Sequence, residues 1–152
     1  MPDVEQLYLE TREALTSYFR RRHGSIQAAE DLLQETFLRL MRQVNRCLTA
    51  ASPRGYLFGI ARHVSADAWR RAQPQADDAV EAVFQQPDTR LEAARETIAR
   101  LPALQREILD LRFQHDLSYT EIAEALDIPV GTVRSRLHNA IALLREQMEK
   151  ES

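Results

Sequence analysis

The sequence is poor in the residues that crosslink or interrupt a chain. It has one cysteine, Cys47, so no disulfide can form within the chain, and this fits a reducing cytoplasm. Only four glycines and six prolines occur in 152 residues, which argues against a disordered chain. No apolar run is long enough to cross a membrane, and the N-terminus lacks an apolar signal core. We therefore expect a cytoplasmic protein.

The chain also lacks a net positive charge and any catalytic motif. The net charge is −3, which by itself does not suggest a nucleic-acid partner. The four histidines are scattered, and there is no HExxH motif, glycine-rich phosphate loop or nucleophile elbow. An enzyme is therefore the least favoured class, and we expect no metal, no cofactor and no small-molecule substrate.

What the sequence has instead is apolar periodicity close to that of an α-helix along nearly its whole length. No segment alternates apolar and polar residues as a strand would. The pattern predicts an all-α protein with helices at Val4–Arg22, Ala28–Asn45, Arg54–Arg71, Thr89–Arg100, Pro102–His115, Tyr119–Leu126 and Val130–Met148.

One segment, residues 72–88, breaks this periodicity. It contains two prolines, several glutamines and four acidic residues, a composition typical of a flexible linker. We predict two small helical domains, residues 1–71 and 89–152, on either side of it. A surface loop within a single domain is the alternative.

A helix-turn-helix is predicted between Ser118 and Ile141. Ser118 precedes an apolar-periodic run and Glu121 follows three residues later, which is the pattern of a capping box. Residues before a proline avoid the helical region, so Pro129 should separate this helix from the next one.

The second helix of this motif has an acid-free polar face. Its predicted buried stripe is Val133, Leu137, Ile141 and Leu144. The groups that then face outward or sideways are those that read base edges or hold phosphates in the major groove: Thr132, Arg134, Ser135, Arg136, His138 and Asn139. DNA binding is our interpretation, and an ordinary helical hairpin with a solvated polar face is the alternative.

The predicted helix at Ala28–Asn45 has a mixed-charge face. Its apolar stripe is predicted to be Leu33, Phe37, Leu40, Met41 and Val44, and the opposite side carries Asp31, Gln34, Glu35, Leu38 and Arg42. An apolar group among mixed charges suits a protein partner better than DNA. A solvated face with one exposed leucine is the alternative.

Aromatic and basic residues are interleaved in the segment Ser52–Arg71. Its predicted buried stripe is Leu57, Ile60, Ala61, Val64 and Ala68, and its flanks carry Tyr56, Phe58, Arg62, His63, Trp69, Arg70 and Arg71. Aromatic rings can stack on unpaired bases while arginines neutralise the backbone of a single strand. The alternative is that Phe58 and Trp69 belong to the core.

Three segments together resemble the bacterial extracytoplasmic-function sigma factors: AEDLLQETFLRL, SPRGYLFGIARHVSADAWRR and LPALQREILDLRFQHDLSYTEIAEALDIPVGTVRSRL. SPRGYLFGIAR also resembles the iron-uptake branch of that family. The resemblance implies a transcription initiation factor that directs core RNA polymerase to specific promoters and helps to melt the −10 element. The partners that it implies are core RNA polymerase, promoter DNA and an anti-sigma factor, either free or membrane-anchored.

The resemblance also assigns roles to residues. The motif that grips the clamp helices of the polymerase matches Asp31, Gln34 and Glu35, with Phe37 buried as support. The part that captures the unwound −10 element matches residues 46–52 and the helix through His63, with its strand held by Arg62, Arg70 and Arg71. The positions that read the −35 element match Arg134, Ser135 and His138, with Thr132 and Arg136 nearer the phosphates.

Two other classes remain open at this point. A stand-alone helix-turn-helix regulator would need a dimer and a palindromic site, and it would leave the aromatic-basic segment unexplained. A helical interaction protein that touches no nucleic acid would be excluded by promoter-specific transcription that depends on Arg134.

Overall fold

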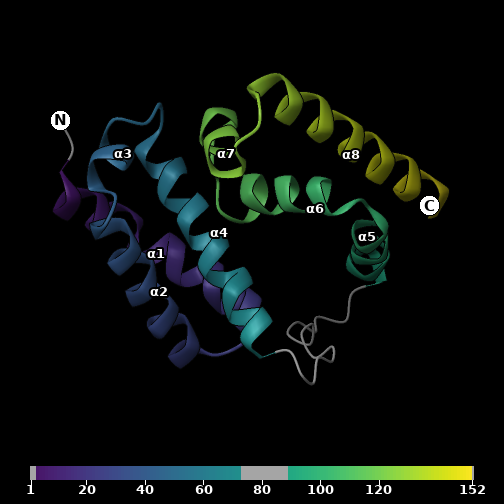
Figure 1. The fold of residues 1–152 in the computed structure, drawn as a ribbon. Coiled ribbons are helices and arrows are strands. Elements are labelled where there is room, and N and C mark those ends of the chain that lie inside the picture. Colours follow the sequence, from purple (N-terminus) through teal and green to yellow (C-terminus); the bar gives the residue numbers. More distant parts are fainter. Residues whose placement is uncertain (1–2, 73–88, 152) are drawn as a thin grey trace. The chain divides into compact units, whose positions relative to one another are not determined.

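The computed structural model describes residues 3–72 and 89–151, and these residues form two compact units (Figure 1). The described residues contain helices and no strand, so the all-α prediction is confirmed. The predicted linker lies outside the described residues except for Ala72. None of the described helices is long and apolar enough to span a lipid bilayer.

The first unit is built mainly of four helices: α1 (Val4–His23), α2 (Ile26–Met41), α3 (Val44–Leu48) and α4 (Pro53–Arg71). Three of them start at a side-chain cap, because Asp3, Ser25 and Ser52 each accept a hydrogen bond from the backbone N–H three residues later. Gly24 ends α1 with φ +77°, a left-handed conformation that glycine adopts without strain.

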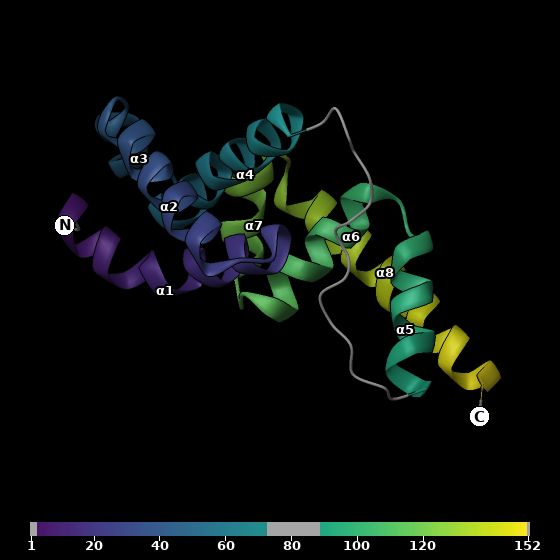
Figure 2. The same ribbon diagram turned by 90° about the horizontal axis from the view of Figure 1, so that it is seen from below.

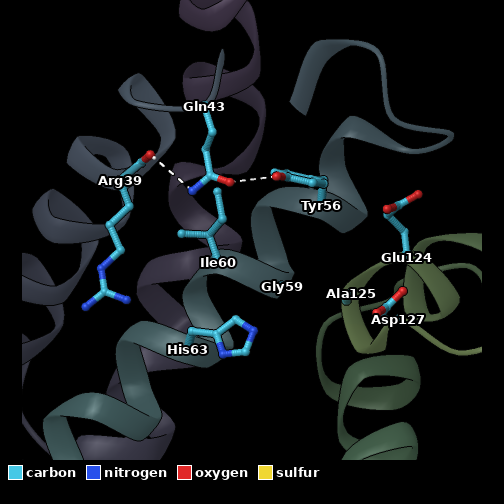
Figure 3. A pocket seen from close by; sticks show the side chains of 9 residues that line it. All are labelled: Arg39, Gln43, Tyr56, Gly59, Ile60, His63, Glu124, Ala125 and Asp127. Atoms are coloured by element: carbon cyan, nitrogen blue, oxygen red, sulfur yellow. Dashed lines mark hydrogen bonds between the residues drawn. The ribbon is translucent and has the colours of Figure 1, made fainter. Parts of the chain in front are cut away.

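The predicted helix at Ala28–Asn45 is in fact interrupted after Met41. Gln43 lies at the break, and its backbone N–H donates to the Leu40 carbonyl, three residues back rather than four. The Gln43 side chain donates to the Arg39 carbonyl at 3.4 Å and accepts a hydrogen bond from the Tyr56 hydroxyl at 2.6 Å (Figure 3). This long-range partner on α4 holds the break in place, and local periodicity could not reveal it.

The core of the first unit forms where α1, α2 and α4 pack against one another (Figure 2). The largest fully buried side chains of this unit are Leu15, Tyr18, Phe19, Leu40, Leu57, Phe58 and Val64. Burial of these side chains supplies most of the stabilisation that the unit gains on folding.

The buried stripe predicted for α2 is confirmed only at Leu40. The buried residues of this helix are Ala29, Leu32, Thr36 and Leu40, whereas Met41 is 59% exposed and Leu33 and Phe37 are only half-buried. Thr36 can be buried because its hydroxyl donates to the Leu32 carbonyl at 2.7 Å, so no polar atom is left unpaired.

Cys47 is a core residue of the same unit. Its side chain is fully buried and its Sγ lies 3.6 Å from the Pro53 carbonyl oxygen. Burial raises the pKa of the thiol to about 11, so the reactive thiolate is scarce at neutral pH.

The second unit is built mainly of α5 (Thr89–Arg100), α6 (Ala103–Leu109), the π-helical turn η3 (Asp110–Gln114), α7 (Tyr119–Leu126) and α8 (Val130–Glu151). The helix predicted at Pro102–His115 thus changes to wider π-type winding over its last turn. Directly after it, the backbone N–H of Leu117 donates to the Leu111 carbonyl at 3.0 Å. Leu111 and Leu117 are both fully buried, so this wide turn closes over the core.

Phe58 was predicted to lie on a single-strand surface, and the structure contradicts this. The ring is fully buried and packs edge-to-face on Tyr18 of α1, with the ring centroids 5.8 Å apart. A ring held on this side of α4 cannot stack on a base, and the core alternative is confirmed for Phe58.

Replacing Phe58 by alanine should therefore lower the free energy of unfolding of the first unit by about 3–5 kcal/mol, because a cavity replaces the ring. Reaction of the single thiol, Cys47, along a urea series measures the unfolding of this unit alone. Trp69→Ala, at a site 39% exposed, is the control and should cost much less. A Phe58→Ala variant of unchanged stability would contradict the assignment.

Candidate functional site

The predicted helix-turn-helix is present in α7 and α8. The Ser118 hydroxyl accepts from the Glu121 backbone N–H at 3.1 Å, and a Glu121 carboxylate oxygen accepts from the Ser118 N–H at 2.8 Å, so the capping box closes in both directions. At the turn, Asp127 has φ +57° and the Ile128 N–H donates to the Ala123 carbonyl. The Pro129 carbonyl then accepts the first hydrogen bonds of α8.

The polar face of α8 points outward as predicted. Val133 and Leu137 are buried, and the exposed residues are Arg134, Ser135, Arg136, His138 and Asn139, with Thr132 half-buried. Ala140 completes the buried stripe, and Ile141 and Leu144, predicted to be buried, are half-buried. The side chains that could contact a groove of DNA are therefore accessible together on one helix.

Tyr119 supports this face, although no sequence pattern indicated it. The guanidinium groups of Arg112 and Arg134 lie 5.3 and 5.5 Å from the centre of its ring. Arg112 also donates to the Leu117 carbonyl at 3.0 Å. Cation–π contacts of this kind restrict the rotamers of Arg134, so its guanidinium is partly positioned before any ligand binds.

The mixed-charge face of α2 is also exposed. Leu38 is 64% exposed, Glu35 is half-buried, and the other exposed members of the predicted set are Asp31, Gln34 and Arg42. Met41, three residues after Leu38, is exposed as well, and its position at the helix end was missed. Two neighbouring apolar side chains surrounded by charged groups are better suited to contact a protein partner than to stay exposed to water.

An ionic network joins this face of α2 to α4. One Arg39 guanidinium nitrogen lies 2.8 Å from Glu35 and 2.9 Å from Asp67, and Asp67 also pairs with Arg70. Hydrogen bonds from Arg39 and then Arg70 lower the pKa of the Asp67 carboxyl. Because these groups are partly exposed, the network contributes modestly to stability, but it fixes where two candidate surfaces meet.

The flank of α4 presents most of the predicted single-strand residues. His63, Trp69, Arg70 and Arg71 are exposed, and Tyr56 and Arg62 are half-buried. The Tyr56 hydroxyl is engaged by Gln43, as described above, and Phe58 belongs to the core. The accessible groups are thus one large aromatic ring and several cations, the combination used to bind single strands.

His23 holds the ring of Trp69. The two rings are stacked with centroids 5.0 Å apart and an interplanar angle of 20°, and His23 Nε2 lies 2.8 Å from the Ser65 hydroxyl oxygen. His23 ends α1 whereas its two partners belong to α4, so the contact joins two helices. No local sequence pattern indicates such a pair.

Burial, and then the charge of Arg22, lower the pKa of His23 below its ordinary value of 6.5. The folded protein therefore binds this proton less readily than the unfolded chain, so the stabilisation is complete above about pH 6.5 and is lost as the pH falls. His23→Gln should flatten the pH dependence of the unfolding free energy between about pH 7.5 and 5.5. Urea unfolding of both proteins at the two pH values measures this difference. An equal pH dependence of the unfolding free energy in the variant and the unmodified protein would contradict the lowered pKa of His23.

Among residues 3–72 and 89–151, no group of three or more histidine, cysteine, aspartate or glutamate side chains is arranged to hold a metal ion.

Comparison with known families matches both units. Residues 7–75 match the family model of Sigma-70 region 2, and residues 91–144 match that of Sigma-70, region 4. The second match contains the helix-turn-helix, and the first contains both candidate surfaces of α2 and α4.

Known proteins with similar sequences align over nearly the whole chain. RNA polymerase sigma factor HrpL of Pseudomonas syringae pv. syringae is 28% identical, with 96% of this chain and 87% of the relative covered. ECF RNA polymerase sigma factor SigL of Mycobacterium tuberculosis strain H37Rv is 31% identical, with 97% and 89% covered. The solved structure of CnrH in complex with the cytosolic domain of CnrY is 25% identical, with a TM-score of 0.61 and 98% and 89% of the two chains covered.

Proposed function

The chain belongs to the extracytoplasmic-function RNA polymerase sigma factors, and we propose that its three exposed surfaces divide promoter recognition among them. The face of α2 binds core RNA polymerase, the flank of α4 holds the separated strand of the −10 element, and the face of α8 reads the −35 element. The observation that carries this proposal is the acid-free polar face of α8, exposed on a helix-turn-helix that is capped in both directions. Sigma factors are not enzymes, and the proposal includes no catalytic step.

Reading of the −35 element is assigned to Arg134, Ser135 and His138, with Thr132, Arg136 and Asn139 beside them. A guanidinium can form two hydrogen bonds to a guanine edge, and the contact of Arg134 with Tyr119 reduces the entropy lost when it does so. Absence of acids on this face avoids repulsion from phosphates.

Binding to the polymerase is assigned to Asp31, Gln34, Glu35, Leu38 and Arg42, and Met41 now joins this set. The exposed Leu38 and Met41 would be buried by the partner, and the surrounding charges would fix its orientation. Phe37 supports the face from below, since its ring packs edge-to-face on Tyr8 with the centroids 4.6 Å apart.

Capture of the −10 strand is assigned to Trp69 with Tyr56, Arg62, His63, Arg70 and Arg71. An unpaired base that stacks on an aromatic ring recovers part of the free energy lost when its base pair opens, a cost of a few kcal/mol. The polymerase would hold both units of the chain at a fixed spacing, so that two modest DNA contacts combine through effective concentration.

Regulation and location follow from the same proposal. We place the chain in the cytoplasm, where core polymerase is found. We also propose that an anti-sigma factor, either free or membrane-anchored, binds it. The complex of CnrH with the cytosolic domain of CnrY supports the idea that such folds bind protein partners. The resemblance of the segment SPRGYLFGIAR to the iron-uptake branch is our reason to propose that branch.

In vitro transcription with core polymerase over a genomic library tests the function as a whole. Transcripts that start at a defined set of promoters only when this chain is added would support it, and genes of iron uptake among them would support the branch. Tight binding of the chain to promoter duplex without polymerase, and no directed transcription, would favour a stand-alone regulator instead.

Leu38→Asp should weaken binding to core polymerase about tenfold or more, because burial of an apolar side chain is replaced by burial of a charge. Leu9→Asp is the matched control: Leu9 is 62% exposed on α1 of the same unit and lies outside the proposed surface. Titration of labelled protein with core polymerase measures both. Equal affinities for the two variants would contradict the assignment of this face.

Arg134→Ala should cost about 1–3 kcal/mol of binding free energy at one base pair of the −35 element if the contact is bidentate. Promoter variants that differ at each −35 position, transcribed with the reconstituted polymerase, measure this. A uniform loss across all sequences would make Arg134 a phosphate contact instead.

A further inference from the structure

The C-terminal turns of α1 and α4 meet at one edge of the first unit (Figure 1). The contact is made by His23, which stacks on Trp69 at 5.0 Å and lies 2.8 Å from Ser65. The last turn of α1 reads RRRH and that of α4 ends in RR, so two basic helix ends are brought together. Neither last turn contains an acidic residue.

The side chains at this edge differ in their roles. Arg22 is half-buried, with its guanidinium 4.3 Å from the centre of the Tyr18 ring, so it is part of the packing. Arg20, Arg21 and Arg71 are exposed. Arg70 is exposed too, and its partner Asp67, the nearest acid along α4, is shared with Arg39.

Trp69 directly precedes Arg70 in the sequence, and its stacking partner His23 directly follows Arg22. His23 covers one side of its indole ring, and the residue remains 39% exposed. The hydrogen bond between His23 and Ser65 restrains the partner on which the indole ring stacks.

We propose that the ends of α1 and α4 form a continuous single-stranded DNA site, in which Arg20 and Arg21 hold the phosphodiester backbone next to a base stacked on Trp69. The inference rests on the proposed function, and it extends the −10 surface from α4 onto α1. His23 is a positioning residue in this site. A single strand fits better than a duplex, because only an unpaired base offers its face to an aromatic ring.

The salt dependence of binding separates the two kinds of contact. Each phosphate contact to a single strand contributes about 0.7 to the slope of log affinity against log salt concentration. Arg20→Gln with Arg21→Gln should therefore make the slope shallower by about 1.4, and Arg20→Gln alone by about half of that. Trp69→Ala should lower the affinity about five- to a hundredfold at every salt concentration and leave the slope unchanged, since stacking releases no counterions.

The experiment uses the full chain and a fluorescent oligonucleotide of twenty thymidines, titrated over a series of salt concentrations. Arg145→Gln is the matched control, because it removes the same exposed charge from α8 in the other unit, outside the proposed site. Its slope should equal that of the unmodified protein. A slope that falls equally in the Arg145 and Arg20 variants would reduce the effect to net charge and overturn the proposal.

A second arm uses the duplex formed by the same oligonucleotide with its complement. If the Arg20 and Arg21 substitutions reduce the duplex slope as much as the single-strand slope, the site binds duplex backbone and the single-strand assignment is wrong. No binding of the single strand by the unmodified chain at low salt would also overturn it. Promoter-directed transcription by the unmodified chain, alongside unchanged slopes in the variants, would sink this inference and leave the proposed function intact.

Discussion

Burial of one apolar stripe on each of α1, α2 and α4 is the interaction on which the first unit depends. Leu15, Tyr18 and Phe19 meet Leu40 from α2 and Leu57 and Phe58 from α4, all with little or no exposure. A helix that buries one side must expose the other, so the same packing that stabilises the unit leaves the far sides of α2 and α4 to solvent and to partners. The exposed sides of α2 and α4 can carry binding residues because the stability of the unit does not depend on the side chains there.

The exposed sides are nevertheless tied to the core and to each other. Arg39 joins Glu35 on the α2 face to Asp67 on α4, and His23 joins the end of α1 to Trp69. Each contact alone is worth little at a partly exposed site. Their consequence is geometric, because a rigid surface loses less conformational entropy when it binds than a mobile one. The surfaces proposed to bind polymerase and DNA are thus parts of one framework.

Features that depend on residues at most four positions apart could be predicted from the sequence. Features that depend on a contact with a distant part of the chain could not. The capping box at Ser118 and the acid-free face around Arg134 are local, and both stand in the structure as expected. The buried stripe of α2 differs from the predicted one because Thr36 can pair its hydroxyl within the helix and so be buried. The break at Gln43 and the pairing of His23 with Trp69 each need a group on another helix, which periodicity does not contain.

A net charge of −3 is compatible with binding a polyanion because charges act over short distances in salt. The Debye length is about 8–10 Å at physiological ionic strength, so an approaching phosphate responds to the groups nearest to it rather than to the sum over the chain. The face of α8 carries two arginines and a histidine without an acid between Val130 and Ile141, and the last turns of α1 and α4 likewise contain no acid. Other acidic residues pair with arginine, as Glu35 and Asp67 do with Arg39. Because its charges are segregated, a protein of negative net charge can present basic faces to DNA without a basic composition overall. The same segregation leaves a mixed-charge surface for a protein partner.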